Sequence, residues 1–160
     1  MELLEDVSVA SMSLHGAPPV KYLHLSDRII AYRHLEGKSP TLIYVGGFLS
    51  TMEIHKAAII EQYAKVHGRA SIRYDQASTG LSTGISRQDA TNETWIADAL
   101  AMMDEVAQKQ PVVLVASSNG CQMCTYIATV RPQQVKGLVF IGKTKFKLIY
   151  FTAEGTPYSY

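Results

Sequence analysis

The sequence predicts an α/β fold with a mostly parallel sheet, and three observations support this prediction. Short apolar runs, each long enough for one strand, alternate with segments of helical periodicity between residues 41 and 141. These runs are apolar throughout, which is typical of parallel strands that are buried on both faces. Two strand-like segments around a turn precede them. We therefore expect an N-terminal antiparallel hairpin, followed by a sheet with helices on both faces.

The predicted elements follow in the order strand, strand, strand, helix, strand, helix, strand, helix, strand. They cover Val20–Leu25, Ile29–Leu35, Thr41–Val45, Met52–Val66, Ala70–Tyr74, Trp95–Val106, Val112–Ala116, Cys121–Val130 and Val135–Ile141. The first two form the hairpin, because Ser26-Asp27 between them favours a turn. A second turn is predicted at residues 37–40, before the first buried strand. No internal repeat or low-complexity tract interrupts this order.

Two of the helices have an apolar stripe in the sequence. In the first, Ile59, Tyr63 and Val66 recur at helical spacing. In the second, the spacing i, i+4, i+7 and i+11 is kept by Trp95, Ala99, Met102 and Val106. Thr91 or Asn92 can cap this second helix, because both side chains accept hydrogen bonds from N–H groups of a first turn. We expect each stripe to face the sheet.

The chain is expected to divide into three parts. Residues 1–19 have no clear period and form a loose leader, and residues 20–142 form a partial domain. Residues 143–160 contain five aromatic residues and no helical period, which predicts an anomalous tail with one edge strand at 146–152. The last strands of the sheet are therefore expected to be missing, as in a splice form, a partial gene model or a fragment.

Composition excludes several classes of function. The formal net charge of the 160 residues is +1, so no nucleic acid or anionic membrane surface is expected as a partner. The apolar run Val112–Ala116 is far shorter than the roughly 20 residues of a membrane-spanning helix. The acidic start of the sequence is unlike a secretory signal or a transit peptide, which predicts an intracellular soluble protein. We expect no metal and no cofactor.

The segment Ala116-Ser117-Ser118-Asn119-Gly120 is the main candidate for chemistry, since it lies between a predicted strand and a predicted helix. It nearly matches G-x-S-x-G, in which a serine sits on a sharp turn between small neighbours. Ala116 replaces the first glycine of that pattern. The spacing assigns the nucleophile to Ser118 rather than Ser117. The alternative is that Ser118 is only part of a turn or a helix cap.

An acyl-transfer site also needs N–H groups that bind the oxyanion of the transition state. The backbone N–H of Asn119, directly after the predicted nucleophile, is one candidate. The other is the N–H of Phe48, in the loop Gly46–Ser50 after the first parallel strand. A glycine turn with a packed aromatic side chain explains that loop equally well. The glycine-rich loop at residues 75–84 matches no phosphate-binding pattern, and we interpret it as a structural turn.

These motifs, in this order, resemble the α/β-hydrolase superfamily from Leu42 to Gly142. Within it, the sequence is most similar to the branch that contains the mitochondrial palmitoyl-protein thioesterase, also described as an acyl-glucuronide esterase. The matching segments are residues 36–40, 47–50, 72–75 with Gly80, 117–120 and 131–135. The resemblance implies a serine esterase or thioesterase acting on small-molecule or acylated-protein esters. It also implies a mitochondrial location, or a cytoplasmic one if the chain truly has no transit peptide.

The resemblance also implies a catalytic Asp and His after the nucleophile, and this chain contains no histidine after Ser118. His15, His24, His34, His55 and His67 all precede it, and we interpret them as surface or core-edge residues. The 160 residues alone are therefore expected to be almost inactive. Two alternatives follow: a non-catalytic interaction protein on the same fold, or a redox protein that uses Cys121 and Cys124.

Overall fold

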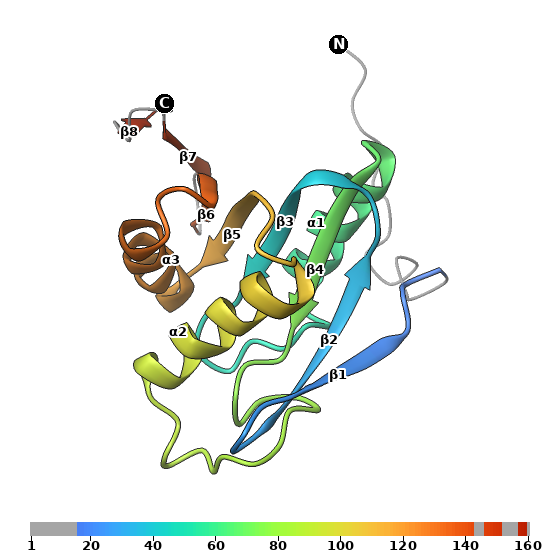
Figure 1. Cartoon of the computed structure of the whole chain (residues 1–160), viewed down its shortest axis with the longest axis vertical. Coiled ribbons are helices and arrows are strands. Elements are labelled where there is room, and N and C mark those ends of the chain that lie inside the picture. The colour runs from blue at the N-terminus through green and yellow to red at the C-terminus, as the bar shows by residue number, and fades with distance from the viewer. Residues whose placement is uncertain (1–15, 143–145, 152–156, 160) are drawn as a thin grey trace.

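The computed structural model describes residues 16–142, 146–151 and 157–159 (Figure 1). Within them, eight strands form one sheet in the order β1-β2-β4-β3-β5-β6-β7-β8. The strands are β1 (Val20–His24), β2 (Ile29–Leu35), β3 (Lys38–Val45), β4 (Arg69–Tyr74), β5 (Val112–Ser117), β6 (Val135–Ile141), β7 (Phe146–Phe151) and β8 (Pro157–Ser159). The predicted leader falls outside the described residues as far as His15.

The centre of the sheet is parallel. β4, β3, β5 and β6 lie side by side and run in the same direction. β1 and β2 form the predicted antiparallel hairpin, and β2 also pairs antiparallel with β4. β3 is therefore flanked by strands that come later in the chain. This arrangement brings the carboxyl ends of β3, β4 and β5 to one edge of the sheet, where catalytic loops of α/β proteins gather.

Two short strands continue the sheet beyond β6. β7 pairs antiparallel with β6, from Gly137 opposite Tyr150 to Ile141 opposite Phe146, and β8 pairs antiparallel with β7. The parallel series therefore ends at β6, as predicted, and the strand expected at residues 146–152 is present as β7. The second strand of the tail, β8, was not predicted, because three residues are too few to give a sequence pattern. Because β7 occupies the outer side of β6, the backbone groups of β6 are paired on both sides.

Helices cover both faces, as Figure 1 shows. α1 (His55–Val66) packs on one face, with Tyr44 and Val115 in a small apolar cluster. α2 (Asn92–Ala101) and α3 (Asn119–Val130) pack on the other face and form the main core with β3, β4, β5 and β6. Trp95, Ala99 and Met102 of the predicted stripe are buried in that core. Thr91 is the cap of α2, since its side chain accepts the Thr94 N–H.

α1 is present, but the prediction of its buried face is wrong. Ile59, Tyr63 and Val66 are exposed, whereas Ala57 and Ala64 are buried. The residue between the two alanines on this buried face is Glu61, whose carboxylate pairs with Arg73 of β4 at 2.7 Å. Ile60 is partly buried and packs against the same cluster, so the buried face consists of Ala57, Ile60 and Ala64 with one ion pair beside them. The helix thus has two apolar stripes at helical spacing, and the one with the smaller side chains faces the sheet.

Two predicted boundaries also change. β3 begins at Lys38 rather than Thr41, because the Lys38 N–H donates to the Gly68 carbonyl at 2.9 Å and pairs this segment with the start of β4. The turn predicted at residues 37–40 is therefore mostly strand. α1 begins at His55 rather than Met52, since the residues before it form turns that belong to the loop after β3.

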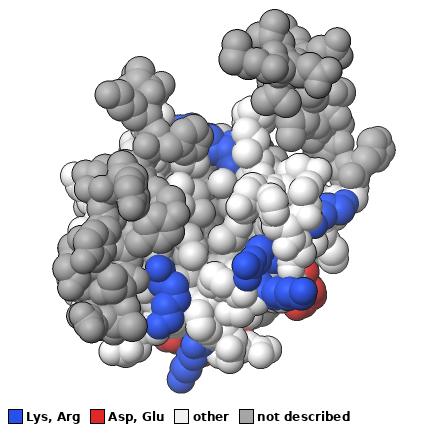
Figure 2. Space-filling model, turned by 90° about the horizontal axis from the view of Figure 1, so that it is seen from above, with Lys and Arg blue, Asp and Glu red and all other residues white. Residues whose placement is uncertain are grey.

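In Figure 2 the Lys and Arg side chains lie as separate groups between uncharged residues on the face that is shown. Among the described residues, no helix has the length and apolar character needed to cross a bilayer.

Candidate active site

Ser118 occupies a sharp bend between β5 and α3. Its backbone angles are φ 52° and ψ −127°, so it belongs to neither of the elements that it joins. A non-glycine residue rarely adopts a positive φ, and this ψ also lies outside the left-handed helical region. Such a conformation costs about 1–3 kcal/mol and persists where the surrounding structure imposes it. The side chain is exposed, so the bend presents its hydroxyl to solvent.

The bend requires small neighbours. A Cβ on Gly120 would lie 2.4 Å from the carbonyl oxygen of Val45 and 2.7 Å from that of Gly46. The first turn of α3 is thus pressed against the end of β3, and only glycine fits at this position. Ala116, two residues before Ser118, is completely buried but accommodates its methyl group. The small residues of the sequence pattern therefore have a direct steric cause.

The loop after β3 lies against the bend. A Cβ on Gly47 would come within 2.7 Å of the Ser118 Cβ and 3.3 Å of its Oγ. The peptide that joins Gly47 to Phe48 is therefore beside the hydroxyl. In the described part of the chain, neither the Phe48 N–H nor the Asn119 N–H donates to another protein group. Both N–H groups are therefore unpaired in the described part of the chain, so their role as oxyanion donors stays a prediction.

The side chain of Phe48 is 60% exposed, so it is not packed into the core. Its ring lies edge-on to Trp95 with 5.9 Å between the centroids, and the Arg87 guanidinium lies 5.7 Å from its centre. These contacts fix the ring at the surface. The alternative of a glycine turn with a packed aromatic side chain is therefore still open, since the Phe48 ring packs on Trp95.

Polar side chains that were not predicted hold the loops together. The Asp75 carboxylate accepts the Met52 N–H at 2.6 Å and the Leu81 N–H at 2.7 Å, which joins the loop after β3 to the loop after β4. Gln76 donates to the Gly46 carbonyl at 3.3 Å. Burial raises the pKa of Asp75, although both N–H groups oppose this shift. The segment at residues 75–84 is therefore the structural turn that we predicted.

Two further contacts fix the bend from the sides. The hydroxyls of Tyr44 and Ser117 are 2.9 Å apart, so Ser117 points into the protein while Ser118 faces out. The Asn119 side chain donates to the Asn92 side chain at 2.8 Å, and this bond links the start of α3 to the start of α2. The sequence contains no signal for these pairs, because each partner comes from a distant segment.

The described histidines lie on other parts of the structure. His24 is at the end of β1, His34 is on β2, and both His55 and His67 are exposed at the two ends of α1. His15 lies outside the described residues. Among the residues described, no histidine makes a hydrogen bond to Ser118. This agrees with their interpretation as surface or core-edge residues.

The two cysteines lack the environment of a redox pair. Cys124 is completely buried in the main core, and Cys121 packs against the same core. Burial raises the pKa of both thiols, whereas a reactive thiol needs a lowered pKa. The redox hypothesis therefore has no support in the geometry. Within the described ranges, no group of three or more His, Cys, Asp or Glu side chains is placed to hold a metal ion.

The fold has clear parallels among known proteins. The chain superposes on the mouse alpha/beta hydrolase domain-containing protein 10 with a TM-score of 0.73 at 35% identity, which covers 76% of this chain and 48% of that one. Potato epoxide hydrolase I matches with a TM-score of 0.66 at 21% identity, over 76% and 39% of the two chains. The chain therefore has the α/β-hydrolase fold, and the predicted resemblance is confirmed.

Sequence comparison names more specific relatives. The chain is 37% identical over 120 residues to human palmitoyl-protein thioesterase ABHD10, mitochondrial, which covers 75% of this chain and 39% of the relative. The bovine protein of the same name is 39% identical over 110 residues, or 69% and 35% of the two. This chain thus spans well under half the length of these relatives. No family model matches it.

Proposed function

We propose that the protein carrying this sequence is a serine hydrolase of thioesters, with Ser118 as its nucleophile. The observation that carries the proposal is the strained bend that exposes the Ser118 hydroxyl at the start of α3 and against Gly47, the residue before Phe48. The names of the sequence relatives favour palmitoylated proteins as substrates and mitochondria as the location. Acyl glucuronides, which are oxygen esters, are a second substrate class for the same chemistry.

The proposed reaction has two steps. The Ser118 Oγ attacks the carbonyl carbon of the thioester while a general base takes its proton. The negative charge that develops on the carbonyl oxygen is bound by the N–H groups of Phe48 and Asn119. Collapse of this intermediate breaks the carbon–sulfur bond, and the protonated base returns its proton to the thiolate. Water then hydrolyses the acyl-serine ester, which releases a carboxylic acid and restores Ser118.

The base is the part of this mechanism that the 160 residues do not supply, since no histidine follows Ser118. We assign this base to the part of the related proteins that has no counterpart in this chain. Serine hydrolases without their base lose about 10⁴- to 10⁶-fold in turnover. A polypeptide of these 160 residues alone is therefore expected to bind an ester without hydrolysing it at a measurable rate. The hypothesis of a non-catalytic interaction protein makes the same prediction for this chain.

The test uses the longest product of the gene that encodes this chain. A fluorophosphonate probe should label the wild-type protein and should not label Ser118→Ala. The control is Ser117→Ala, which removes the neighbouring buried hydroxyl and should keep the labelling. Hydrolysis of an S-palmitoyl peptide should follow the same pattern. Equal labelling of Ser118→Ala and wild type would refute the assignment, and a longest product without any labelling would favour the interaction protein.

A further inference from the structure

The loop after β3 contains a strained turn, and this turn carries the Phe48 N–H group that is one of the two proposed oxyanion donors. The Ser50 N–H donates to the Gly47 carbonyl at 3.0 Å, so Phe48 and Leu49 are the two central residues of the turn. Leu49 has φ 60°, although a leucine rarely adopts a positive φ. Such a conformation persists only where the surrounding contacts impose it. The position of the Phe48 N–H therefore depends on what holds the two ends of this turn.

Side chains from the end of β4 hold the loop on both sides of the turn. After the turn, the Arg73 Nη1 donates to the Met52 carbonyl at 2.9 Å, and the Met52 N–H donates to the Asp75 carboxylate at 2.6 Å. Both backbone groups of Met52 are therefore bound by side chains. Before the turn, Gln76 donates to the Gly46 carbonyl at 3.3 Å. The strained turn is thus held between two fixed points of the backbone.

The guanidinium of Arg73 is itself held in one orientation. Arg73 is 3% exposed, and its Nε and Nη2 donate to the two carboxylate oxygens of Glu61 on α1 at 2.7 Å and 3.1 Å. The Nη1 also lies 3.3 Å from the carboxylate of Glu53, whose other oxygen accepts the Arg33 Nε at 2.8 Å. A bidentate pair fixes the plane of a guanidinium group. The remaining Nη1 therefore points at the Met52 carbonyl.

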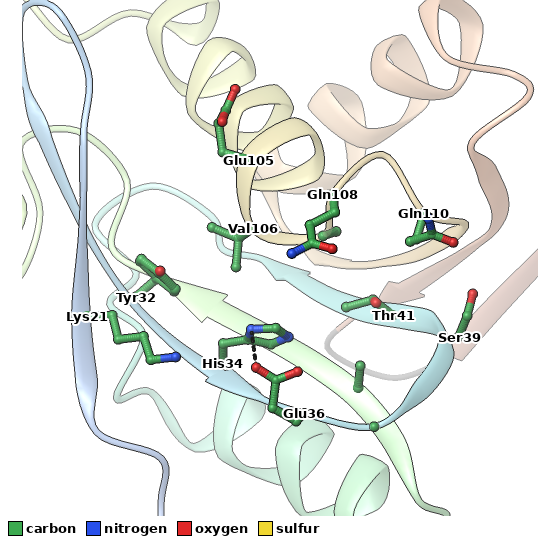
Figure 3. Close-up of a pocket in the computed structure, with 13 residues that line it drawn as sticks. Lys21, Tyr32, His34, Glu36, Ser39, Thr41, Glu105, Val106, Gln108 and Gln110 are labelled. Carbon is green, nitrogen blue, oxygen red and sulfur yellow. Dashed lines mark ion pairs between the residues drawn. The ribbon is translucent and has the colours of Figure 1, made fainter.

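Stability of the fold does not by itself explain a buried arginine. Figure 3 shows a contrasting pair near the end of β2, where the His34 Nδ1 lies 3.3 Å from a carboxylate oxygen of Glu36 and the Glu36 side chain is 81% exposed. Such a surface pair loses little hydration and contributes little. Burial of a guanidinium is costly, and well-packed apolar residues often stabilise a fold equally well. The bond to the Met52 carbonyl, however, is a contact that an apolar side chain cannot make.

We propose that Arg73 is a positioning residue for the reaction at Ser118, because through the Met52 carbonyl it keeps the Phe48 N–H in place for the oxyanion. This proposal rests on the proposed function, in which that N–H binds the negative charge of the transition state. A misplaced donor binds the transition state less well and the substrate equally well. Loss of Arg73 therefore lowers kcat and leaves KM nearly unchanged. A residue that only stabilised the fold would change the amount of folded enzyme, but not the turnover of each folded molecule.

The test measures hydrolysis of an S-palmitoyl peptide by the longest product of the gene that encodes this chain. The fluorophosphonate probe, allowed to react to completion, counts the folded active sites, and kcat is expressed per labelled site. Arg73→Met, which has no donor, should lower this kcat about 10- to 100-fold with KM within about twofold. Arg73→Lys can still donate to the Met52 carbonyl and should lose less. It also carries the test if Arg73→Met does not fold.

Arg28→Met is the matched control. Arg28 also pairs with a buried carboxylate, that of Asp98 at 2.7 Å, but none of its hydrogen bonds in the described structure reaches the loop after β3. This variant should unfold at lower urea concentration, yet keep kcat per labelled site within about twofold of wild type. If the Arg73 variants lose no more kcat than Arg28→Met, Arg73 is only structural and the proposal is wrong. A wild-type protein without labelling would instead refute the proposed function, so the two failures are distinguishable.

Discussion

The backbone of Gly47 lies directly against Ser118, so that a methyl group on Gly47 would sit 2.7 Å from the Ser118 Cβ. Carbon atoms that are not bonded do not approach so closely. The loop that holds one proposed oxyanion donor and the bend that holds the proposed nucleophile therefore constrain each other. The geometry of both the loop and the bend therefore depends on residue 47 having no side chain.

Gly47→Ala is therefore expected to lower the stability of the fold by about 1–3 kcal/mol and to abolish fluorophosphonate labelling. The added methyl group has to displace either Ser118 or the peptide before Phe48. Gly68→Ala is the control for labelling: its φ of +62° makes it lose stability through backbone strain, but a Cβ there meets no atom within 4 Å, so labelling should stay at the wild-type level. Urea unfolding and labelling measure the two effects. A Gly47→Ala protein with wild-type labelling would contradict this account.

The strain at Ser118 predicts that two substitutions differ in stability. Ser118→Gly and Ser118→Ala both remove the hydroxyl, but only glycine adopts φ 52° and ψ −127° without strain. Ser118→Gly is expected to be about 1–2 kcal/mol more stable than Ser118→Ala, since relief of strain exceeds the greater entropy of its unfolded chain. Chemical denaturation measures the difference. Equal stability would show that the bend is not strained.

Asp75→Asn tests the two hydrogen bonds that connect the loop after β3 to the loop after β4. An asparagine oxygen can accept only one of the two N–H groups of Met52 and Leu81, and its amide then faces the other. We expect a loss of about 2–3 kcal/mol, because a buried donor is left without a partner. Asp89→Asn, at an exposed carboxylate that pairs with Ser86, is the control and should cost little. A similar loss in both variants would argue against a special role for Asp75.

His34 predicts a pH dependence of stability. Burial lowers its pKa in the folded state, and Lys21 adds to this effect while Glu36 opposes it. The unfolded chain therefore binds the proton more tightly, and stability is lost as the pH falls through the unfolded pKa of about 6.5. His34→Gln should lose less stability than wild type between pH 7 and about 5. His55→Gln, at an exposed position, should keep the wild-type profile in denaturant titrations.

The raised pKa values of Cys121 and Cys124 predict unreactive thiols. Iodoacetamide at neutral pH should modify neither residue rapidly in the folded chain, because the thiolate is the reacting species. Both should react after unfolding in guanidinium chloride, and mass spectrometry measures the two rates. Rapid modification of Cys121 in the folded chain would restore the redox hypothesis.

The sequence predicts the order of the elements well and the faces of the helices less well. Apolar runs and turn residues are local signals, and they predict β5, β6 and the bend at Ser118 from neighbouring residues alone. The buried face of α1 carries the small residues Ala57 and Ala64 and also Glu61, whose partner Arg73 is twelve residues away on another element. No periodicity can show that a charged residue belongs to the buried side.

The same limit applies to the candidate site. The small residues around Ser118 are a local pattern, and the structure explains them by the contact between Gly120 and the end of β3. Asp75, Gln76 and Asn92 act through backbone groups or side chains of other loops, so only the folded chain reveals them.

Because β7 runs antiparallel to β6, it extends the sheet without adding a segment that covers one of its faces. A parallel strand is reached by a crossover, which lays a new segment over one face, whereas a hairpin adds width and no thickness. On the α1 side, Val113, Val139 and Ile141 are accordingly only partly buried in the described structure. A dye that fluoresces in apolar surroundings should therefore bind to the natively folded chain, at the apolar surface over β5 and β6.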